Sequence, residues 1–94
     1  MVSAVVLISV EHDHIPDVAQ ALAEMDGVTE VHSVAGRYDL VASVRVKTNE
    51  DLAELIPGRM LKLPHIKSAE TLIAFRVYSK RDVESAFSLG GRGQ

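Results

Sequence analysis

The stretch VTEVHSVAGRYDLVASVRV, residues 28–46, decides the fold. Residues 28–35 are rich in β-branched side chains and stop at Gly36, which predicts a strand followed by a turn. Residues 39–47 then alternate between two faces, and one of these faces is formed by Leu40, Ala42, Val44 and Val46. Two such strands joined by a glycine-bearing turn predict an antiparallel β-hairpin.

A further strand is predicted at the start of the chain, over residues 2–10 (VSAVVLISV). Its β-branched residues favour an extended backbone, and apolar side chains occur on both of its faces. That pattern is typical of a central strand covered on both sides.

A helix is predicted between this strand and the hairpin, with apolar residues at helical spacing from Ile15 to Met25. Either Asp13 or His14 can take the N-cap position, and Pro16 suits the first turn, where its missing N–H costs nothing. The helix is expected to stop at Asp26-Gly27.

A second helix is predicted after the hairpin. Thr48 and Asp51 have the spacing of a capping box, with Asp in place of the usual Glu. Pro57-Gly58 is expected to kink the helix or make it restart near Arg59, and Pro64 to end it.

The last predicted strand covers residues 66–78, and a short helix over residues 82–89 precedes a flexible glycine-rich tail. The chain is thus divided into a domain at residues 1–79 and a C-terminal extension at residues 80–94. The order βαββαβ predicts an α+β, ferredoxin-like fold, with a four-stranded antiparallel sheet and both helices on one face. The other face still carries apolar side chains, so we expect the sheets of two subunits to cover each other.

Composition limits the function. Of the 94 residues, 47% are hydrophobic, which is much apolar surface for one small core and favours an oligomer. There are no cysteines, which excludes disulfides and thiol chemistry. The formal net charge of −3 argues against direct nucleic-acid binding. The apolar N-terminal stretch is too short to span a bilayer and lacks the basic start of a signal peptide, so a cytoplasmic location is expected.

Residues 11–14, Glu-His-Asp-His, are the first candidate for chemistry, because imidazoles and carboxylates bind transition metals. We favour a polar loop that caps the first helix, since His32 and His65 lie elsewhere in the sequence and no third ligand is assured. No G-x-S-x-G, P-loop or G-x-G-x-x-G pattern occurs. The sequence therefore predicts no metal, no cofactor and no enzymatic activity.

The turn between the hairpin strands is the second candidate. Gly36 can place its backbone at positive φ and expose N–H groups that suit a carboxylate, while Asp39 can accept from an ammonium group. Those are the two charges of an amino acid. The same residues also make a good hairpin turn, and residue types alone leave both interpretations open.

The hairpin sequence, NEDLAELI after it and LPHIKSAETLIAFRVY at the end together resemble the effector-binding domain of Lrp/AsnC regulators. That domain is called RAM, for regulation of amino acid metabolism. The resemblance covers about residues 2–79. Its most specific pieces are the turn with Gly36, Asp39 and Leu40, and the fourth-strand triplet Glu70-Thr71-Leu72.

The resemblance implies dimers through facing sheets and rings of dimers with amino acids bound between them. By position it assigns the effector loop to Gly36, Tyr38, Asp39 and Leu40, with Arg37 as a neighbour, and adds Thr71 and Leu72 from the fourth strand. Full-length members carry a helix-turn-helix domain, whereas this chain begins at the first strand. It therefore resembles a stand-alone RAM protein that could mix with full-length relatives. A small dimeric α+β-barrel enzyme and an ACT-like regulatory domain remain the alternatives.

Overall fold

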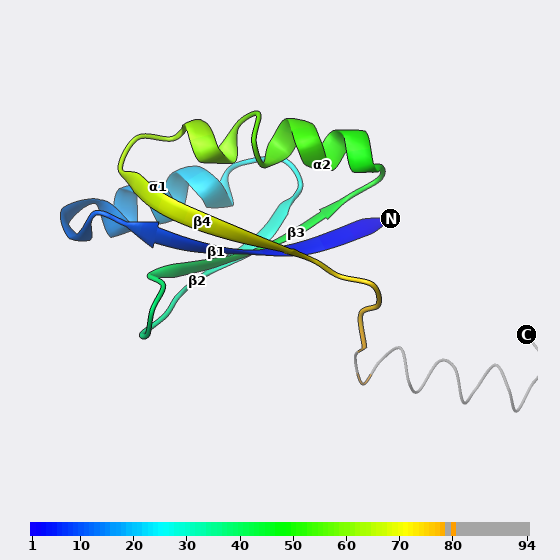
Figure 1. The fold of residues 1–94 in the computed structure, drawn as a ribbon, viewed down its shortest axis with the longest axis horizontal. Helices are drawn as coiled ribbons and strands as arrows, with labels where there is room; N and C mark the ends of the chain where they lie inside the picture. Colours follow the sequence, from blue (N-terminus) through cyan, green and yellow to red (C-terminus); the bar gives the residue numbers. More distant parts are fainter. Residues whose placement is uncertain (79, 81–94) are drawn as a thin grey trace, which may run out of the picture.

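A computed structural model describes residues 1–78 and 80 of the protein. Its four strands form one antiparallel sheet in the order β2-β3-β1-β4. Both helices lie on one side of this sheet (Figure 1). The predicted α+β, ferredoxin-like βαββαβ plan is confirmed. The elements are β1 (Val2–Val10), η1 (His12–His14), α1 (Ile15–Ala23), β2 (Val28–Ser33), β3 (Leu40–Val46), α2 (Asn49–Leu55), η2 (Met60–Lys62) and β4 (Ile66–Ile73).

The core lies between the sheet and the two helices. Alternate residues of β1 and β3 point into it, because successive side chains of a strand face opposite sides. Helices α1 and α2 close it from above. The buried apolar residues are Ala4, Val6, Ile8, Val10, Val18, Leu22, Leu40, Ala42, Val44, Leu52, Leu55, Ile56 and Met60.

The start of α2 follows the predicted capping pattern: Thr48 is its N-cap, and the Thr48 hydroxyl accepts from the Asp51 N–H at 3.1 Å. The predicted interruption near Pro57 is also present. A Cβ at position 58 would lie 2.1 Å from the Glu54 carbonyl oxygen, so only glycine allows this close approach. The chain restarts as the short 3-10 turn η2, not as an α-helix.

Several predicted boundaries were wrong. Strand β4 ends at Ile73 instead of residue 78, because Ile73 pairs with Ala4 and β1 has almost no residues left beyond that point. Strand β2 ends at Ser33 instead of residue 35, and α1 ends at Ala23, before Asp26. His14 is the N-cap of α1, but its side chain makes no capping hydrogen bond. The predicted helix at residues 82–89 lies outside the described residues.

The sheet face away from the helices carries a central apolar patch, formed by Val5, Leu7, Val41 and Leu72. Register places Val5 opposite Leu72 and Leu7 opposite Val41. Val5, Leu7 and Val41 are half-buried, and Leu72 is 49% exposed. We call this surface the open face.

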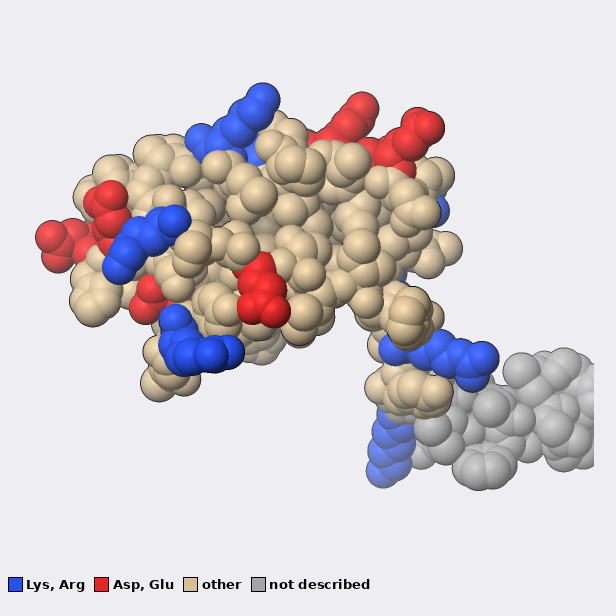
Figure 2. Space-filling view, viewed as in Figure 1, with Lys and Arg blue, Asp and Glu red and all other residues tan. Residues whose placement is uncertain are grey.

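Within residues 1–78 and 80, neither helix combines the length and the apolar character needed to cross a membrane. Acidic and basic side chains are interspersed on the face of the molecule drawn in Figure 2.

Candidate functional site

The turn between β2 and β3 is fixed at both of its ends. The Val34 N–H donates to the Asp39 carbonyl at 3.0 Å, and the Asp39 N–H donates to the Ile8 carbonyl at 2.9 Å. The Asp39 carboxylate reaches β1 as well, where Oδ2 accepts from the Val10 N–H at 2.8 Å. Three hydrogen bonds thus anchor Asp39 to the last residues of β1 and to its own hairpin.

Tyr38 ties the same turn to β4. Its hydroxyl donates to Glu70 Oε1 at 2.5 Å. This hydrogen bond raises the pKa of the Tyr38 phenol above its ordinary value, with smaller contributions from burial and from the Glu70 charge. The Arg37 guanidinium lies 5.9 Å from the centre of the Tyr38 ring, within reach of a cation–π contact. The turn therefore contacts β1 and β4 through two different side chains.

The tip of the turn has the predicted backbone. Gly36 has a φ of +140°, a conformation that side-chain-bearing residues rarely adopt, and a Cβ there would meet nothing within 4 Å. Among the described residues, the N–H groups of Gly36, Arg37 and Tyr38 have no hydrogen-bond acceptor. Successive unpaired N–H groups bind an anion when the backbone directs them toward one point.

The structure brings together only part of the predicted site. Gly36, Arg37, Tyr38, Asp39 and Leu40 are consecutive, but Leu40 is fully buried in the core, so it supports the turn from below. Thr71 and Leu72 point to opposite faces of β4. Leu72 lies on the open face beside Val5, whereas Thr71 faces the helix layer.

Thr71 lines a shallow hollow of about 350 Å³ between α2 and β4. Its other walls are mainly apolar: Asn49, Leu52, Ala53, Ile56, Pro57 and Ile73. Thr71 and the turn are thus parts of two different surfaces of one subunit.

Two participants are absent from the predicted site. Glu70, named from the sequence only as part of the fourth-strand triplet, accepts a hydrogen bond from the Tyr38 hydroxyl, and the Val10 N–H donates one to Asp39. The signal that could have found them is the strand order. Because β1 lies between β3 and β4 and is antiparallel to both, the end of β1 lies beside the starts of β3 and β4, at one end of the sheet.

The turn carries groups that match the two charges of a zwitterion. Its unpaired N–H groups suit a carboxylate, and Asp39 Oδ1, which makes no hydrogen bond to the described residues, can accept from an ammonium group. The turn projects toward the open side of the sheet (Figure 1).

Curated relatives of the chain are named as transcriptional regulators. An uncharacterised HTH-type transcriptional regulator of Pyrococcus furiosus is 34% identical over 70 residues, which are 74% of this chain and 47% of the relative. A regulator of Pyrococcus horikoshii is 30% identical over 59 residues, 63% of this chain and 39% of the relative. The chain therefore spans half or less of the length of these curated relatives.

Solved structures share the fold. A protein of Thermus thermophilus is 41% identical, with a TM-score of 0.79, and the match covers 85% of this chain and all of that one. A transcriptional regulator of Neisseria meningitidis, solved as a complex with L-Met, has a TM-score of 0.74 over 83% of this chain and 52% of that one. At 12% identity, that second likeness is one of fold alone.

A family model described as the Lrp/AsnC ligand binding domain matches residues 3–84 of the chain. This match covers most of the sequence. The chain belongs to the Lrp/AsnC ligand-binding domain family.

Proposed function

We propose that the protein is an amino-acid-sensing module that binds its effector at the turn formed by residues 36–40. The observation that carries this proposal is the double role of Asp39. One carboxylate oxygen anchors the turn to Val10, which leaves the other for a ligand's ammonium group. The N–H groups of Gly36, Arg37 and Tyr38, unpaired among the described residues, are suited to the ligand's carboxylate.

The module works as an oligomer. The turn is an exposed edge of one subunit, and an amino acid bound there needs further walls to be withdrawn from water. The open face, with its apolar residues Val5, Leu7, Val41 and Leu72, suits a dimer in which two such faces pack together. A ring of such dimers would place other subunits next to the turn. Full-length Lrp/AsnC relatives could replace some of the subunits in that ring.

The proposed role is regulatory and not enzymatic. The relatives are named as transcriptional regulators, and the groups that the turn offers suit the two charges of an amino acid. The net charge of −3 and the interspersed charges on the surface disfavour direct contact with phosphates (Figure 2). We place this activity in the cytoplasm.

Thermal-shift screening of the protein amino acids, starting with L-Met, identifies the ligand, and calorimetry then measures its affinity. Asp39→Asn is the informative variant, because its amide oxygen can still accept from the Val10 N–H while the negative charge is lost. A charge-assisted hydrogen bond contributes about 1.5–3 kcal/mol. The Asn variant should therefore bind about 10- to 150-fold more weakly, with an unchanged circular dichroism spectrum.

Asp26→Asn is the matched control, because Asp26 precedes Gly27 in a turn at the other end of α1. It should leave the affinity unchanged. Equal affinities of the wild type and Asp39→Asn for every ligand found would contradict the assignment of the turn.

A further inference from the structure

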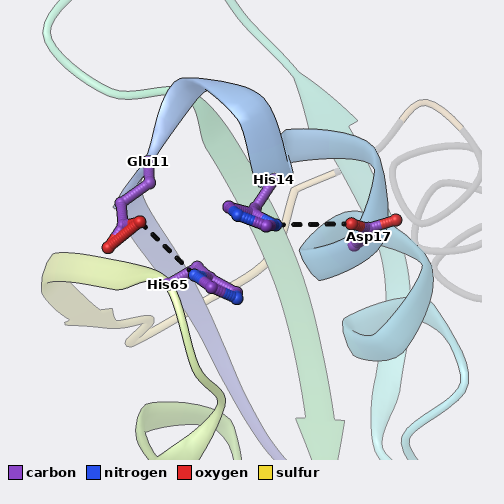
Figure 3. Close-up of polar contacts among 4 residues, drawn as sticks. All are labelled: Glu11, His14, Asp17 and His65. Atoms are coloured by element: carbon purple, nitrogen blue, oxygen red, sulfur yellow. Dashed lines mark hydrogen bonds and ion pairs between the residues drawn. The ribbon is translucent and has the colours of Figure 1, made fainter.

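Three side chains with metal-binding chemistry meet at one end of the sheet. Glu11 follows β1, His14 precedes α1, and His65 precedes β4. Their ligand atoms all lie within 4.8 Å of one another (Figure 3). His65 is far from residues 11–14 in the sequence, and the antiparallel pairing of β4 with β1 brings it there. The third ligand that the sequence did not assure is therefore next to the other two.

Polar contacts hold this cluster in place. The Glu11 N–H donates to the His65 carbonyl at 2.9 Å, and Glu11 Oε2 lies 3.3 Å from His65 Nδ1. The His14 and His65 rings are stacked, with centroids 3.5 Å apart and planes 6° from parallel. Asp17 Oδ2 lies 3.5 Å from His14 Nδ1 (Figure 3). A carboxylate at one ring nitrogen leaves the other nitrogen of His14 for a metal.

The backbone at His65 is unusual. It has a φ of +74°, in the left-handed region that side-chain-bearing residues seldom adopt. Such conformations cluster at functional sites. The side chains of His14 and His65 are 36% and 37% exposed, so an ion from solvent can reach them.

We propose that Glu11, His14 and His65 bind a divalent transition-metal ion such as Zn²⁺. Two imidazoles and one carboxylate are a ligand set that zinc takes in proteins, with a fourth position left for water. This site is separate from the amino-acid-binding turn and does not depend on that proposal.

The rearrangement needed is small. Tetrahedral coordination at zinc–ligand distances of about 2.1 Å puts donor atoms about 3.4 Å apart. The ligand atoms are already within 4.8 Å, so they must approach by on the order of 1 Å, and the stacked rings must tilt so that their nitrogens converge. Side chains that are more than one third exposed are free to make that rotation.

A bound metal would cross-link three segments of the fold. Glu11 is also the residue after Val10, whose N–H is held by Asp39. The metal would therefore fix the end of β1 from one side while the turn holds it from the other.

Calorimetry with Zn²⁺ and absorption spectroscopy with Co²⁺, on the full chain without an affinity tag, test the site. The wild type should bind one ion per chain. His14→Asn and His65→Asn should each weaken binding by at least about 10-fold. Asparagine suits both backbones, because it is a good N-cap and tolerates positive φ. Saturating zinc should also raise the thermal midpoint by on the order of 10 °C, and this rise should be lost in both variants.

His12→Asn and His32→Asn are the matched controls. His12 shares the η1 turn with His14 but does not belong to the cluster, and His32 pairs only with the exposed Glu30, at 3.3 Å, among the described residues. Both controls should bind zinc like the wild type. The proposal is overturned if no saturable binding occurs at about 100 µM metal, or if either His14→Asn or His65→Asn binds zinc as tightly as the wild type.

Discussion

The two faces of the sheet differ sharply although they are built from alternate residues of the same strands. On the helix-covered face, Val6, Ile8, Leu40 and Ala42 are all 0% exposed. On the open face, the neighbouring Val5, Leu7 and Val41 are only half-buried. The first face is completed within one subunit, and the second has apolar side chains that nothing in the described part of the same subunit covers.

Because of this difference, substitutions on the two faces test folding and assembly separately. A substitution on the covered face should change the stability of each subunit, whatever the protein concentration. A substitution on the open face should change association, so its effect should depend on concentration. The adjacent β1 residues Leu7 and Ile8 allow the comparison with side chains of equal size.

Ile8→Ala should have the largest effect. It removes a fully buried side chain from the centre of the core, which costs about 2–5 kcal/mol of unfolding free energy. Chemical denaturation should show this loss equally at low and high protein concentration. Leu7→Ala is the matched variant. If both substitutions had the same concentration-independent cost, the two faces would not differ in the way described.

Leu7→Asp should have the next largest effect, on association. A charge in the middle of the open face would be buried without a partner if two sheets pack together. We expect the dissociation constant of the proposed dimer to rise about 30-fold or more, while circular dichroism still reports a folded chain. Light scattering of the wild type at a mass near 10.2 kDa would contradict the proposed dimer.

Thr48→Ala should have a smaller effect, and it should change the folding stability of the subunit but not its association. It removes the oxygen that accepts from the Asp51 N–H at the start of α2, which costs about 0.5–2 kcal/mol. Thr48→Ser keeps the acceptor and is the control. Sedimentation should show no change in oligomeric state for either variant, since α2 lies away from the open face.

The Tyr38 titration should be the smallest effect. Its pKa is raised in the folded protein, mainly by the hydrogen bond to Glu70, so the neutral phenol stabilises the fold. That stabilisation is fully present below the ordinary tyrosine pKa of about 10 and is lost as the pH rises through the raised value. Tyr78→Phe leaves Tyr38 as the single phenol, whose phenolate absorbance can be followed. In that background, Glu70→Gln should lower the pH midpoint of the Tyr38 titration. An unchanged midpoint would exclude Glu70 as the cause of the raised Tyr38 pKa.

The sequence alone determined the features that depend on neighbouring residues. The β-branched residues 2–10 specified the first strand, and the alternation in residues 40–46 specified another strand and its buried face. Gly36 allowed the positive φ in the turn. Thr48 marked the helix start, and Pro57-Gly58 marked the interruption. These are local effects of side-chain period, backbone freedom and capping.

The tertiary structure decided what depends on strand order and register. Strand β4 ends at Ile73, which pairs with Ala4 near the first residue of β1, and Thr71 and Leu72 lie on opposite faces of β4. The tertiary structure also joined Tyr38 to Glu70, Asp39 to Val10, and His65 to Glu11. Each of these pairs spans a long stretch of chain, so no local pattern encodes it. The partners meet because the end of β1 and the starts of β3 and β4 lie side by side at one end of the antiparallel sheet.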